Sequence, residues 1–590
     1  MKSLSYLNKY FIKYKWRLLL GVLFIIASNL FYVYMPKLVG QATDQFDDGF
    51  EPEDWFSIAL SLGGIYILMS IGKGIFLFFT RQTIIVVSRY IEFDLKNEVY
   101  KQYQRLTYNF YKRNNTGDLM NRISEDVSHV RMYLGPGVMY TVNLSVLFIL
   151  TFTFMADISL KLTLFTLAPL PIMSFLVYKV SSRMNRQSTQ VQRQQSRIST
   201  FVQETFSGIS VLKAYSGESK FKDEFNEEAD TYLGKHMDLV KTNALFMPTI
   251  TFLIGVSTIL TIYLGGVMAI DPDSNISPGN IVTFVFYVNM LTWPFASVGW
   301  VTSLIQRAAA SQDRINEFLD EEPEVKSTNN EQFDFKGDVA FQNVSYTFPT
   351  SGINAVRNLS FSIKKGETLA ILGRTGSGKS TVINLLMRQF DPENGQILID
   401  GKPLFGININ DFRKQAGVVP QEVFLFSDSI RNNVKFGLTE DSEVTDADII
   451  KVLKTTHVWH NIKSFKTGLD TVLGERGVNL SGGQKQRISI ARALIRNPKL
   501  LILDDCLSAV DTETEEIILN NLKEQIEKNT TLIVSHRVSS IRNADRILVL
   551  DHGSKVEEGT HEELLALDGV YAEMYAKQLL EDQKESENEE

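Results

Sequence analysis

The sequence predicts an all-α domain of six membrane-spanning helices with long helical extensions, followed by an α/β domain with a largely parallel sheet. Three observations predict this fold class. Runs of about 20 mostly apolar residues recur through the first half of the chain. Long charged segments of helical pattern separate some of these runs. In the second half, short β-rich runs alternate with helical patterns, which is typical of an α/β domain.

Bulk composition conceals this division. The chain has 590 residues, a net charge of −8, and charged and hydrophobic fractions of 22% and 44%. Because nucleic-acid-binding proteins usually present a basic face, this acidic balance argues against a nucleic-acid partner. The chain has one cysteine, Cys506, which excludes an intrachain disulfide and a cysteine-based zinc cluster.

Six apolar runs are long enough for a helix to cross the membrane, whose hydrocarbon layer is about 30 Å thick. They cover residues 17–36, 55–80, 135–155, 160–180, 244–270 and 281–305. The second run contains Lys73, nearer the cytoplasmic end of its span. Two interpretations of Lys73 stay open: its head group reaches the membrane interface, or its charge faces a cavity or a substrate.

Loop charges predict that both termini lie in the cytoplasm. Residues 1–17, which end at the first residue of the first run, carry five Lys or Arg residues and no acid, whereas the loop 41–55 after the run carries six acids and no Lys or Arg. Positive residues stay on the cytoplasmic side of a membrane. Segments 81–134 and 181–243 are long, charged and poor in helix breakers, so we expect helices that extend well into the cytoplasm.

Composition also predicts the domain boundaries. Residues 1–320 form the membrane domain, 321–337 an acidic polar linker, and 338–578 the α/β domain. The tail 579–590 is acidic and poor in apolar residues, so we expect it to be disordered.

A glycine-rich loop lies between the strand-like run TLAILG and the helix-like run TVINLLMRQF. It reads Gly373-Arg-Thr-Gly-Ser-Gly378-Lys379-Ser380. Glycines let the backbone wrap closely around phosphate, and N–H groups of the loop and of the helix N-terminus bind the anion. In this pattern Lys379 reaches the β- and γ-phosphates, and the Ser380 hydroxyl is a Mg²⁺ ligand. The loop therefore predicts a site for a nucleoside triphosphate with Mg²⁺.

Two further motifs follow downstream. An apolar strand-like run ends in Asp504 and Asp505, and the first carboxylate can hold the Mg²⁺ shell at the strand end. The motif Leu480-Ser481-Gly482-Gly483-Gln484 places a serine and two glycines at a helix start, which makes a second phosphate-binding nest. Because the P-loop already binds phosphate in this domain, the second nest suits a nucleotide held by another copy.

With these three motifs, the chain resembles an ATP-binding cassette (ABC) transporter, specifically an exporter half-transporter with its membrane domain ahead of its ATPase. The resemblance covers essentially the whole chain except the linker and the acidic tail. It implies that two cassettes pair head to tail, with each ATP between the P-loop of one chain and the LSGGQ motif of the other. It also implies that Asn115–Arg122 and Phe206–Lys213 form coupling regions that seat on cassettes.

The resemblance assigns further residues to the ATP site. Gln421 resembles the Q-loop glutamine, His536 the switch histidine, and Phe348 stands where a tyrosine usually stacks on adenine. Residues 474–477 resemble the X-loop and 508–511 the D-loop. The catalytic candidates are Asp505, His536 and Gln421, and the Mg²⁺ candidates are Ser380, Gln421 and Asp504. The candidates for binding ATP are Phe348, Gly373, Arg374, Thr375, Gly376, Ser377, Gly378, Lys379, Ser380, Thr381, Gln421, Ser481, Gly482, Gly483 and Gln484.

Asp505 departs from the family pattern, which has a glutamate directly after the Mg²⁺ aspartate. Aspartate is one methylene shorter, which retracts the carboxylate by about 1 Å, enough for a loss on the order of 10²-fold in rate. The string DDCLSAVDTETE resembles the impaired-site member of heterodimeric exporters, which lends an intact LSGGQ motif to its partner. A heterodimer with a second half-transporter is therefore favoured, and a homodimer with slow hydrolysis is the alternative.

The resemblance implies Mg²⁺-dependent ATP hydrolysis coupled to export by alternating access. The expected substrates are amphipathic or hydrophobic small molecules or lipids, and the expected location is the cytoplasmic (inner or plasma) membrane of a bacterium, among membrane lipids. Peptide export and a nucleotide-gated channel of the same architecture are the alternatives. Single-channel currents would separate a channel from a pump.

Overall fold

The computed structural model describes residues 2–47, 55–271, 276–326, 329, 331–349, 351–438, 443–474, 477, 479–507, 510 and 512–589. The chain divides into two compact units. The first comprises Met1–Gln104 and Thr116–Glu321, and the second comprises Arg105–Asn115 and Glu322–Glu590. The short segment Arg105–Asn115 therefore belongs with the C-terminal half of the chain, although the sequence predicts that all of 1–320 forms one domain.

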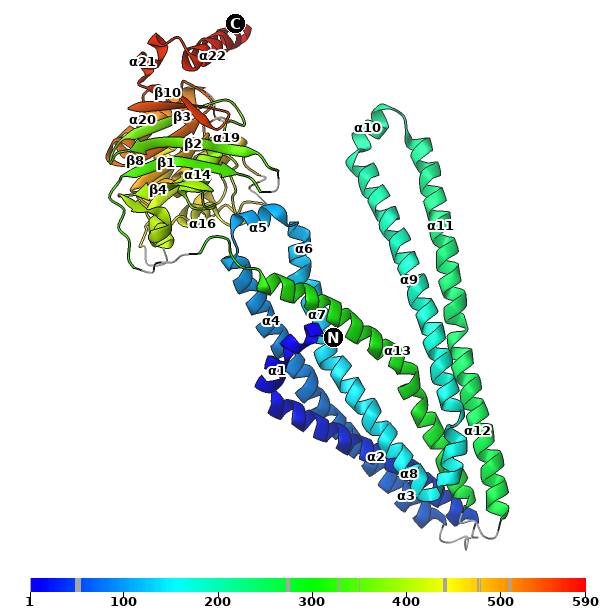
Figure 1. Ribbon diagram of the computed structural model, residues 1–590. Coiled ribbons are helices and arrows are strands. Elements are labelled where there is room, and N and C mark those ends of the chain that lie inside the picture. Colours follow the sequence, from blue (N-terminus) through cyan, green and yellow to red (C-terminus); the bar gives the residue numbers. More distant parts are fainter. Residues whose placement is uncertain are drawn as a thin grey trace. The chain divides into compact units, whose positions relative to one another are not determined.

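The first unit is built from helices (Figure 1). Its α-helices are α1 (Asn8–Lys13), α2 (Lys15–Asp47), α3 (Trp55–Thr80), α4 (Val86–Arg105), α6 (Thr116–Asn121), α7 (Val127–Met132), α8 (Val138–Leu167), α9 (Pro169–Ser207), α10 (Ile209–Ala214), α11 (Glu218–Ala244), α12 (Phe246–Ile270) and α13 (Pro278–Asp320). Short helical turns η1 (Lys2–Leu7), η2 (Arg81–Ile85), η3 (Arg122–Asp126) and η4 (Tyr133–Gly137) join some of them. The last three are π-turns, which interrupt the regular hydrogen-bond pattern without ending the helix.

Among the described residues, five helical runs are long and apolar enough to cross a membrane. They are Lys15–Gln45, Phe56–Arg105, Thr116–Ser207, Glu218–Ile270 and Pro278–Asp320. The third run contains two of the six spans that the sequence predicts. The predicted number is therefore roughly consistent with the structure.

The third run is interrupted at Ser159. The backbone of Ser159 is extended (φ −163°, ψ 111°) inside α8, and its hydroxyl oxygen accepts a hydrogen bond from the N–H of Leu162 at 3.3 Å. A serine that accepts from the N–H three residues later is an N-cap, so a new helix begins here. The interruption falls between the predicted spans 135–155 and 160–180.

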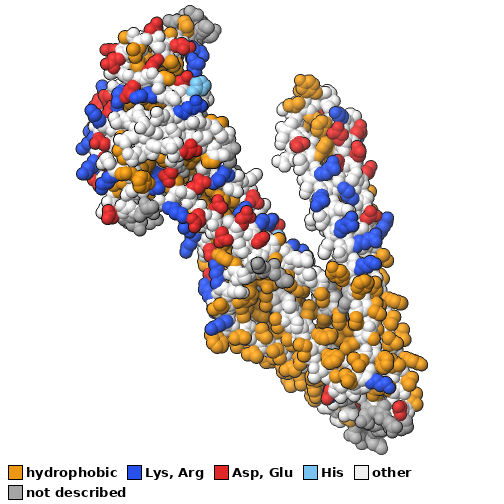
Figure 2. Space-filling model, in the orientation of Figure 1, with side chains coloured by type: hydrophobic (Ala, Val, Ile, Leu, Met, Phe, Trp, Pro, Cys, Tyr) orange, Lys and Arg blue, Asp and Glu red, His pale blue; other side chains and the backbone are white. Residues whose placement is uncertain are grey.

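Apolar side chains gather on one part of this unit. Figure 2 shows hydrophobic side chains over α2, α3, α8 and α12, while Lys, Arg, Asp and Glu gather over the extensions around α10 and α11. Buried residues from α2, α8, α9, α12 and α13 form one apolar cluster, which includes Val33, Leu147, Phe284 and Tyr287. The hydroxyl of Tyr287 donates to the carbonyl of Val33 at 3.0 Å, so a polar bond ties α13 to α2 inside this cluster.

The second unit contains two sheets. The antiparallel sheet has the order β2-β1-β4-β5, and the larger sheet has the order β10-β9-β3-β8-β7-β6. Neighbours from β9 to β6 pair in parallel, and β10 pairs antiparallel with β9. The strands are β1 (Val339–Thr347), β2 (Asn354–Ile363), β3 (Thr368–Leu372), β4 (Asn394–Ile399), β5 (Lys402–Pro403), β6 (Ala416–Val419), β7 (Leu500–Asp504), β8 (Thr530–Ser535), β9 (Arg546–Asp551) and β10 (Ser554–Gly559).

The second unit also contains helices. They are α14 (Lys379–Leu386), α15 (Ile409–Lys414), α16 (Ile430–Lys435), α17 (Asp446–Thr455), α18 (Trp459–Lys463), α19 (Gly482–Leu494), α20 (Thr512–Lys528), α21 (His561–Ala566) and α22 (Val570–Glu589), with the short turns η5 (Leu404–Gly406) and η6 (Gly468–Asp470) and, from the membrane half of the sequence, α5 (Tyr108–Arg113) in the same unit. Strands β3, β7 and β8 are buried along most of their length, as expected for parallel strands covered on both faces.

The predicted fold class is confirmed: a helical membrane domain precedes an α/β domain with a largely parallel sheet. One expectation differs at the C-terminus. Helix α22 continues to Glu589, where composition predicts a disordered tail from residue 579. The prediction of disorder used only the lack of apolar residues in this segment. Glu, Gln and Lys have high helix propensity and readily extend a helix that has already formed.

Candidate functional site

The candidate catalytic residues meet at one edge of the larger sheet. Strands β3, β8, β7 and β6 are consecutive neighbours in that sheet and run parallel. The P-loop follows β3, His536 follows β8, Asp505 follows β7, and Gln421 lies just after β6. Because the carboxyl ends of parallel strands lie at the same edge, residues far apart in the sequence converge there.

The P-loop has the backbone conformation that its glycines permit. Gly376 and Gly378 have φ of +83° and +98°. A Cβ on Gly378 would lie 2.2 Å from the carbonyl oxygen of Ala355, so the loop passes too close to β2 for a side chain. Helix α14 begins directly after Gly378, which directs its N-terminal N–H groups into the loop.

Lys379 lies folded over the loop that it follows. Its Nζ donates to the carbonyl oxygens of Gly373 at 2.6 Å and Arg374 at 2.9 Å. Burial lowers the pKa of the ammonium group, and the negative charges of Asp505 and Asp504 oppose that change. The cation is thus kept beside two carboxylates at the place where a phosphate would lie.

Ser380 and Asp504 form a pair of oxygen donors. The Ser380 hydroxyl donates to Oδ1 of Asp504 at 3.4 Å. Asp504 is only 7% exposed, and burial raises the pKa of its carboxyl against the opposing effect of the Ser380 hydrogen bond. Hard oxygen donors such as these are the ligands that Mg²⁺ takes, together with substrate phosphates.

Asp505 is held by the residues around it. Its backbone N–H donates to the carbonyl of Val534 at 2.7 Å, and its φ is +47°, a left-handed conformation that Asp tolerates better than most residues. Oδ1 lies 2.9 Å from Nδ1 of His536, and Oδ2 accepts from Nε2 of Gln421 at 3.4 Å. Asp505 therefore contacts both of the other catalytic candidates.

An open cavity of about 450 Å³ joins these groups. Of the residues predicted from the sequence, it is lined by Phe348, Thr375, Gly376, Gly378, Lys379, Ser380, Thr381, Gln421, Asp504, Asp505 and His536. Gly373, Arg374 and Ser377 belong to the loop without lining this space. The sequence analysis missed Ile353, Asn354, Ala355, Arg357 and His552. These residues come from β2, from Ile353 just before it and from the turn after β9, and their positions carry no motif that could have identified them.

The aromatic ring of Phe348 lies in a cluster with Tyr346 and Phe390. Tyr346 stacks on Phe390 with ring centroids 5.1 Å apart, and Phe348 meets each of the two edge-on. Tyr346 is buried, so Phe348 is the ring of this pair that faces the cavity.

The LSGGQ motif lies apart from this cavity. Ser481 is the N-cap of α19: its hydroxyl oxygen accepts from the N–H of Gln484 at 3.3 Å, and Oε1 of Gln484 accepts from the N–H of Ser481 at 3.1 Å. This reciprocal pair is a capping box, which fixes the start of the helix. Ser481, Gly482, Gly483 and Gln484 are absent from the residues that line the cavity.

Helix α5 packs on the second unit. Nδ2 of Asn109 donates to Oε2 of Glu324 at 2.8 Å, and Arg113 pairs with the same carboxylate. The Nζ of Lys112 lies 5.2 Å from the ring centroid of Phe348. This segment precedes the predicted coupling region Asn115–Arg122, most of which belongs to the first unit.

The second predicted coupling region forms α10 and its flanks in the first unit. Phe206, Val211 and Tyr215 expose 70%, 60% and 84% of their surface there, an unusual density of exposed apolar side chains on a helical extension. Two other predicted elements lie mostly outside the described residues: Glu475 and Arg476 of the X-loop, and Ser508, Ala509 and Asp511 of the D-loop.

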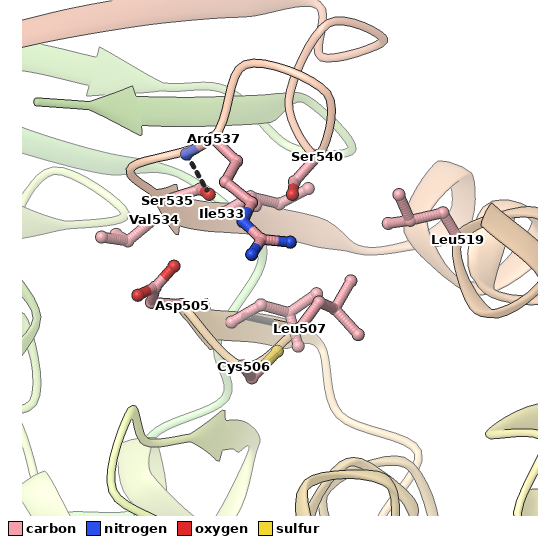
Figure 3. A pocket seen from close by; sticks show the side chains of 10 residues that line it. Asp505, Cys506, Leu507, Leu519, Ile533, Val534, Ser535, Arg537 and Ser540 are labelled. Carbon is pink, nitrogen blue, oxygen red and sulfur yellow. Dashed lines mark hydrogen bonds between the residues drawn. The ribbon is translucent and has the colours of Figure 1, made fainter. Parts of the chain in front are cut away.

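A small cavity lies behind Asp505 (Figure 3). Cys506, Leu507, Arg537 and Ser540 are among its lining residues, and the N–H of Arg537 donates to the hydroxyl of Ser535 at 2.9 Å. Its volume of about 10 Å³ holds at most one water molecule. Burial raises the pKa of the Cys506 thiol, so this cysteine is an inert packing residue.

A P-loop, an acidic strand end and a separate LSGGQ helix, preceded by a helical membrane domain, define an exporter-type ATPase. The family described as ABC transporter transmembrane region matches residues 18–295, and the family described as ABC transporter matches residues 356–508. The chain belongs to the ABC transporter family, and it has both the membrane and the ATP-binding parts of an ATP-hydrolysing transporter.

Similar proteins span the same length. A probable multidrug resistance ABC transporter ATP-binding/permease protein, YheI of Bacillus subtilis (strain 168), is 34% identical over 98% of each chain. An ATP-dependent lipid A-core flippase of Pseudoalteromonas translucida (strain TAC 125) is 34% identical over 86% of this chain and 87% of the flippase. A bacterial Atm1-family ABC exporter, solved with ATP bound, has a TM-score of 0.78 and 25% identity over 95% of this chain and 99% of the exporter.

Proposed function

We propose that this chain is one half of a two-chain pump that uses ATP to export amphipathic or hydrophobic small molecules or lipids by alternating access. It lies in the cytoplasmic membrane with both termini inside, because the loop charges favour that orientation. The named relatives, a multidrug resistance transporter and a lipid flippase, support this class of substrate.

One observation carries the dimeric part of this proposal. The LSGGQ helix is fully formed, with its capping box in place, yet it does not line the cavity of its own P-loop. Its N–H groups are suited to an anion. A nucleotide on a second chain fits this helix, and the LSGGQ helix of that chain would in turn complete the cavity described above.

The residues that line the cavity have different roles in hydrolysis. Lys379 and the N–H groups of the P-loop bind and orient the phosphates, and the ring of Phe348 stacks on adenine. Ser380, Asp504 and Gln421 would hold Mg²⁺, which would neutralise charge on the phosphates. Asp505, oriented by His536 and Gln421, is placed to accept a proton from attacking water.

Asp505 also bears on whether the dimer consists of two identical chains or of two different ones. Its shorter side chain retracts the base, while the LSGGQ helix of this chain is intact. We therefore favour a heterodimer in which the companion chain carries a glutamate base and uses the LSGGQ motif of this one.

ATPase activity in lipid vesicles tests the proposal. The chain is purified together with the half-transporter encoded beside it, if one exists, and otherwise alone. We expect Mg²⁺-dependent hydrolysis, and we expect the double variant Lys379→Ala/Ser481→Ala, which alters what this chain gives to both shared sites, to lower it by at least about 10²-fold, the loss typical of removing groups that stabilise developing charge. Lys402→Ala, at an exposed lysine of the same unit, serves as the matched control and leaves the rate unchanged. Activity that survives the double variant would contradict the proposal.

A further inference from the structure

Lys73 lies inside α3, eight residues before Arg81, the first charged residue after it. At 1.5 Å per residue, its Cα lies about 12 Å from the end of the span. A lysine at this depth can reach the interface only if its side chain extends toward Arg81. The structure shows where the side chain goes instead.

The side chain of Lys73 extends away from the Arg81 end of its span. The hydroxyl of Ser28 on α2 donates to the carbonyl of Lys73 at 3.2 Å, which places Ser28 level with the lysine backbone. The Nζ lies 3.3 Å from the ring centroid of Tyr32, one helical turn further along α2. Tyr32 is 15 residues beyond Arg17, about 22 Å into a hydrocarbon layer about 30 Å thick. Helix geometry favours this direction, because side chains lean toward the helix N-terminus, here Trp55.

The ammonium group has no counter-charge there. Among the residues that the structure describes, no Asp or Glu forms an ion pair with Lys73. Its ammonium group makes a cation–π contact with the ring of Tyr32. A cation–π contact satisfies one side of an ammonium that carries three donors. Charged side chains at this depth are costly and mark substrate pathways more often than structural sites.

The surroundings offer places for both ends of an amphiphile. On the polar side, Asn29, which is 4% exposed, follows Ser28 on α2 and donates to Oδ1 of Asn143 on α8 at 2.8 Å. On the apolar side, Phe76, one turn after Lys73, packs against Phe31 and Phe24 with centroids 5.7 and 6.1 Å apart. A charged head group at Lys73 could therefore lie beside a tail along these rings.

We propose that Lys73 recognises the negatively charged head group of an amphiphile with a carboxylate, sulfate or phosphate, and that it makes the exporter prefer such substrates. This inference rests on the proposed function, since it names the class of molecule that the pump would bind. The ligand supplies the counter-charge that the protein lacks at this depth. The same chemistry could come from a transported amphiphile or from an anionic lipid of the bilayer.

The test compares head groups on one tail. The full-length chain, with its companion subunit where the two co-purify, is reconstituted in phosphatidylcholine vesicles, and stimulation of ATPase activity is titrated with dodecyl phosphate or with neutral dodecylglycerol. We expect Lys73→Met to raise the half-maximal concentration of dodecyl phosphate at least about tenfold, while that of dodecylglycerol changes less than about twofold. Lys73→Arg keeps the charge and most of the response. Lys161→Met, at an exposed lysine of α8, is the matched control.

A second arm separates the two sources of the anion. Phosphatidylglycerol replaces part of the phosphatidylcholine, with no dodecyl phosphate added. Loss of stimulation in this arm alone would assign Lys73 to a bilayer lipid, and loss with dodecyl phosphate alone would assign it to a transported amphiphile. Equal weakening of the charged and neutral responses, or no weakening of either, would overturn the inference. Because the double variant Lys379→Ala/Ser481→Ala reports separately on ATPase activity, a failure of the proposed function would be distinguishable.

Discussion

The imidazole Nδ1 of His536 lies 2.9 Å from Oδ1 and 3.0 Å from Oδ2 of Asp505, so one nitrogen meets both oxygens of the carboxylate. Gln421 donates to the same carboxylate at 3.4 Å. The candidate base is thus engaged by two protein side chains at the end of β7. A longer side chain at this position would move the carboxylate into the cavity while keeping the same neighbours.

The variant Asp505→Glu is therefore expected to increase hydrolysis. Extending the carboxylate by about 1 Å restores the reach of the usual glutamate. The gain at the site of this chain's own P-loop can be on the order of 10²-fold in kcat with little change in KM, once the glutamate base of a companion chain, where one is present, has been replaced. Steady-state ATPase rates in vesicles measure both constants. Asp505→Asn is the control, because it keeps the shape and removes the base. A kcat for Asp505→Glu no higher than that of the unaltered chain would show that side-chain length does not limit this site.

Asp504 is expected to destabilise the nucleotide-free protein at neutral pH. Burial raises the pKa of its carboxyl, so the folded state binds a proton more tightly than the unfolded state does. The stabilising contribution is complete below the ordinary pKa of Asp and is lost as the pH rises through the raised value. Asp504→Asn removes this penalty, and we expect Tm without nucleotide or Mg²⁺ to rise by a few degrees at pH 7.

The pH dependence makes that prediction specific. The Tm difference between Asp504→Asn and the unaltered chain should shrink as the pH falls toward the ordinary pKa of Asp, because the native carboxyl becomes protonated. Asp551→Asn, at a less buried position on the end of β9, is the control, and its Tm is measured over the same pH range. An unchanged or lower Tm for Asp504→Asn at pH 7 would contradict this account.

The sequence predicted those features of the site that follow from strand ends and glycine patterns. The P-loop, Asp504 and Asp505 each follow a recognisable strand, and parallel strands bring their ends together. Arg357 and His552 line the same cavity from β2 and from a turn, because the antiparallel sheet folds over the P-loop. That approach depends on tertiary packing, and no local pattern encodes it.

Similar limits apply to the fold. The apolar runs 135–155 and 160–180 leave a gap at 156–159, and the interruption at Ser159 falls in it. This was predictable because the length of an apolar run indicates the length of the helix that crosses the membrane. The grouping of Arg105–Asn115 with the cassette could not be predicted, since it depends on contacts such as that between Asn109 and Glu324, 215 residues apart.

Complementation between two inactive variants tests whether sites are shared between chains. Lys379→Ala damages the P-loop, and Ser481→Ala removes the cap of α19 together with the hydroxyl offered to the second nucleotide. If each site takes one motif from each chain, a mixed dimer of these two variants keeps one intact site. If the chain pairs with itself, we expect each homogeneous homodimer to be inactive and co-expressed chains to recover ATPase activity.

A matched capping variant separates stability from function in that experiment. Thr445 caps α17 with the same kind of capping box, so Thr445→Ala should lower stability by a similar amount, about 1 kcal/mol, without affecting hydrolysis. Absence of recovery in the mixed dimer would indicate either that the site lies within one chain or that the partner is a different chain. Repeating the experiment with the companion subunit distinguishes these two cases, because its P-loop would depend on Ser481 of this chain.

Phe348 is expected to determine the affinity for ATP through the face of its ring. The ring lines the nucleotide cavity and is supported edge-on by Tyr346 and Phe390. Stacking of a base on an aromatic ring contributes about 1–3 kcal/mol, so Phe348→Ala should raise KM for ATP between about 5- and 150-fold. Phe348→Tyr keeps the ring and adds only the hydroxyl usual in the family, so its KM should match that of the unaltered chain. Titration with a purine and a pyrimidine triphosphate provides the decisive comparison: Phe348→Ala should weaken ATP more than CTP, since the larger base loses more stacking. Equal losses for both nucleotides would mean that the ring supports the loop without contacting the base.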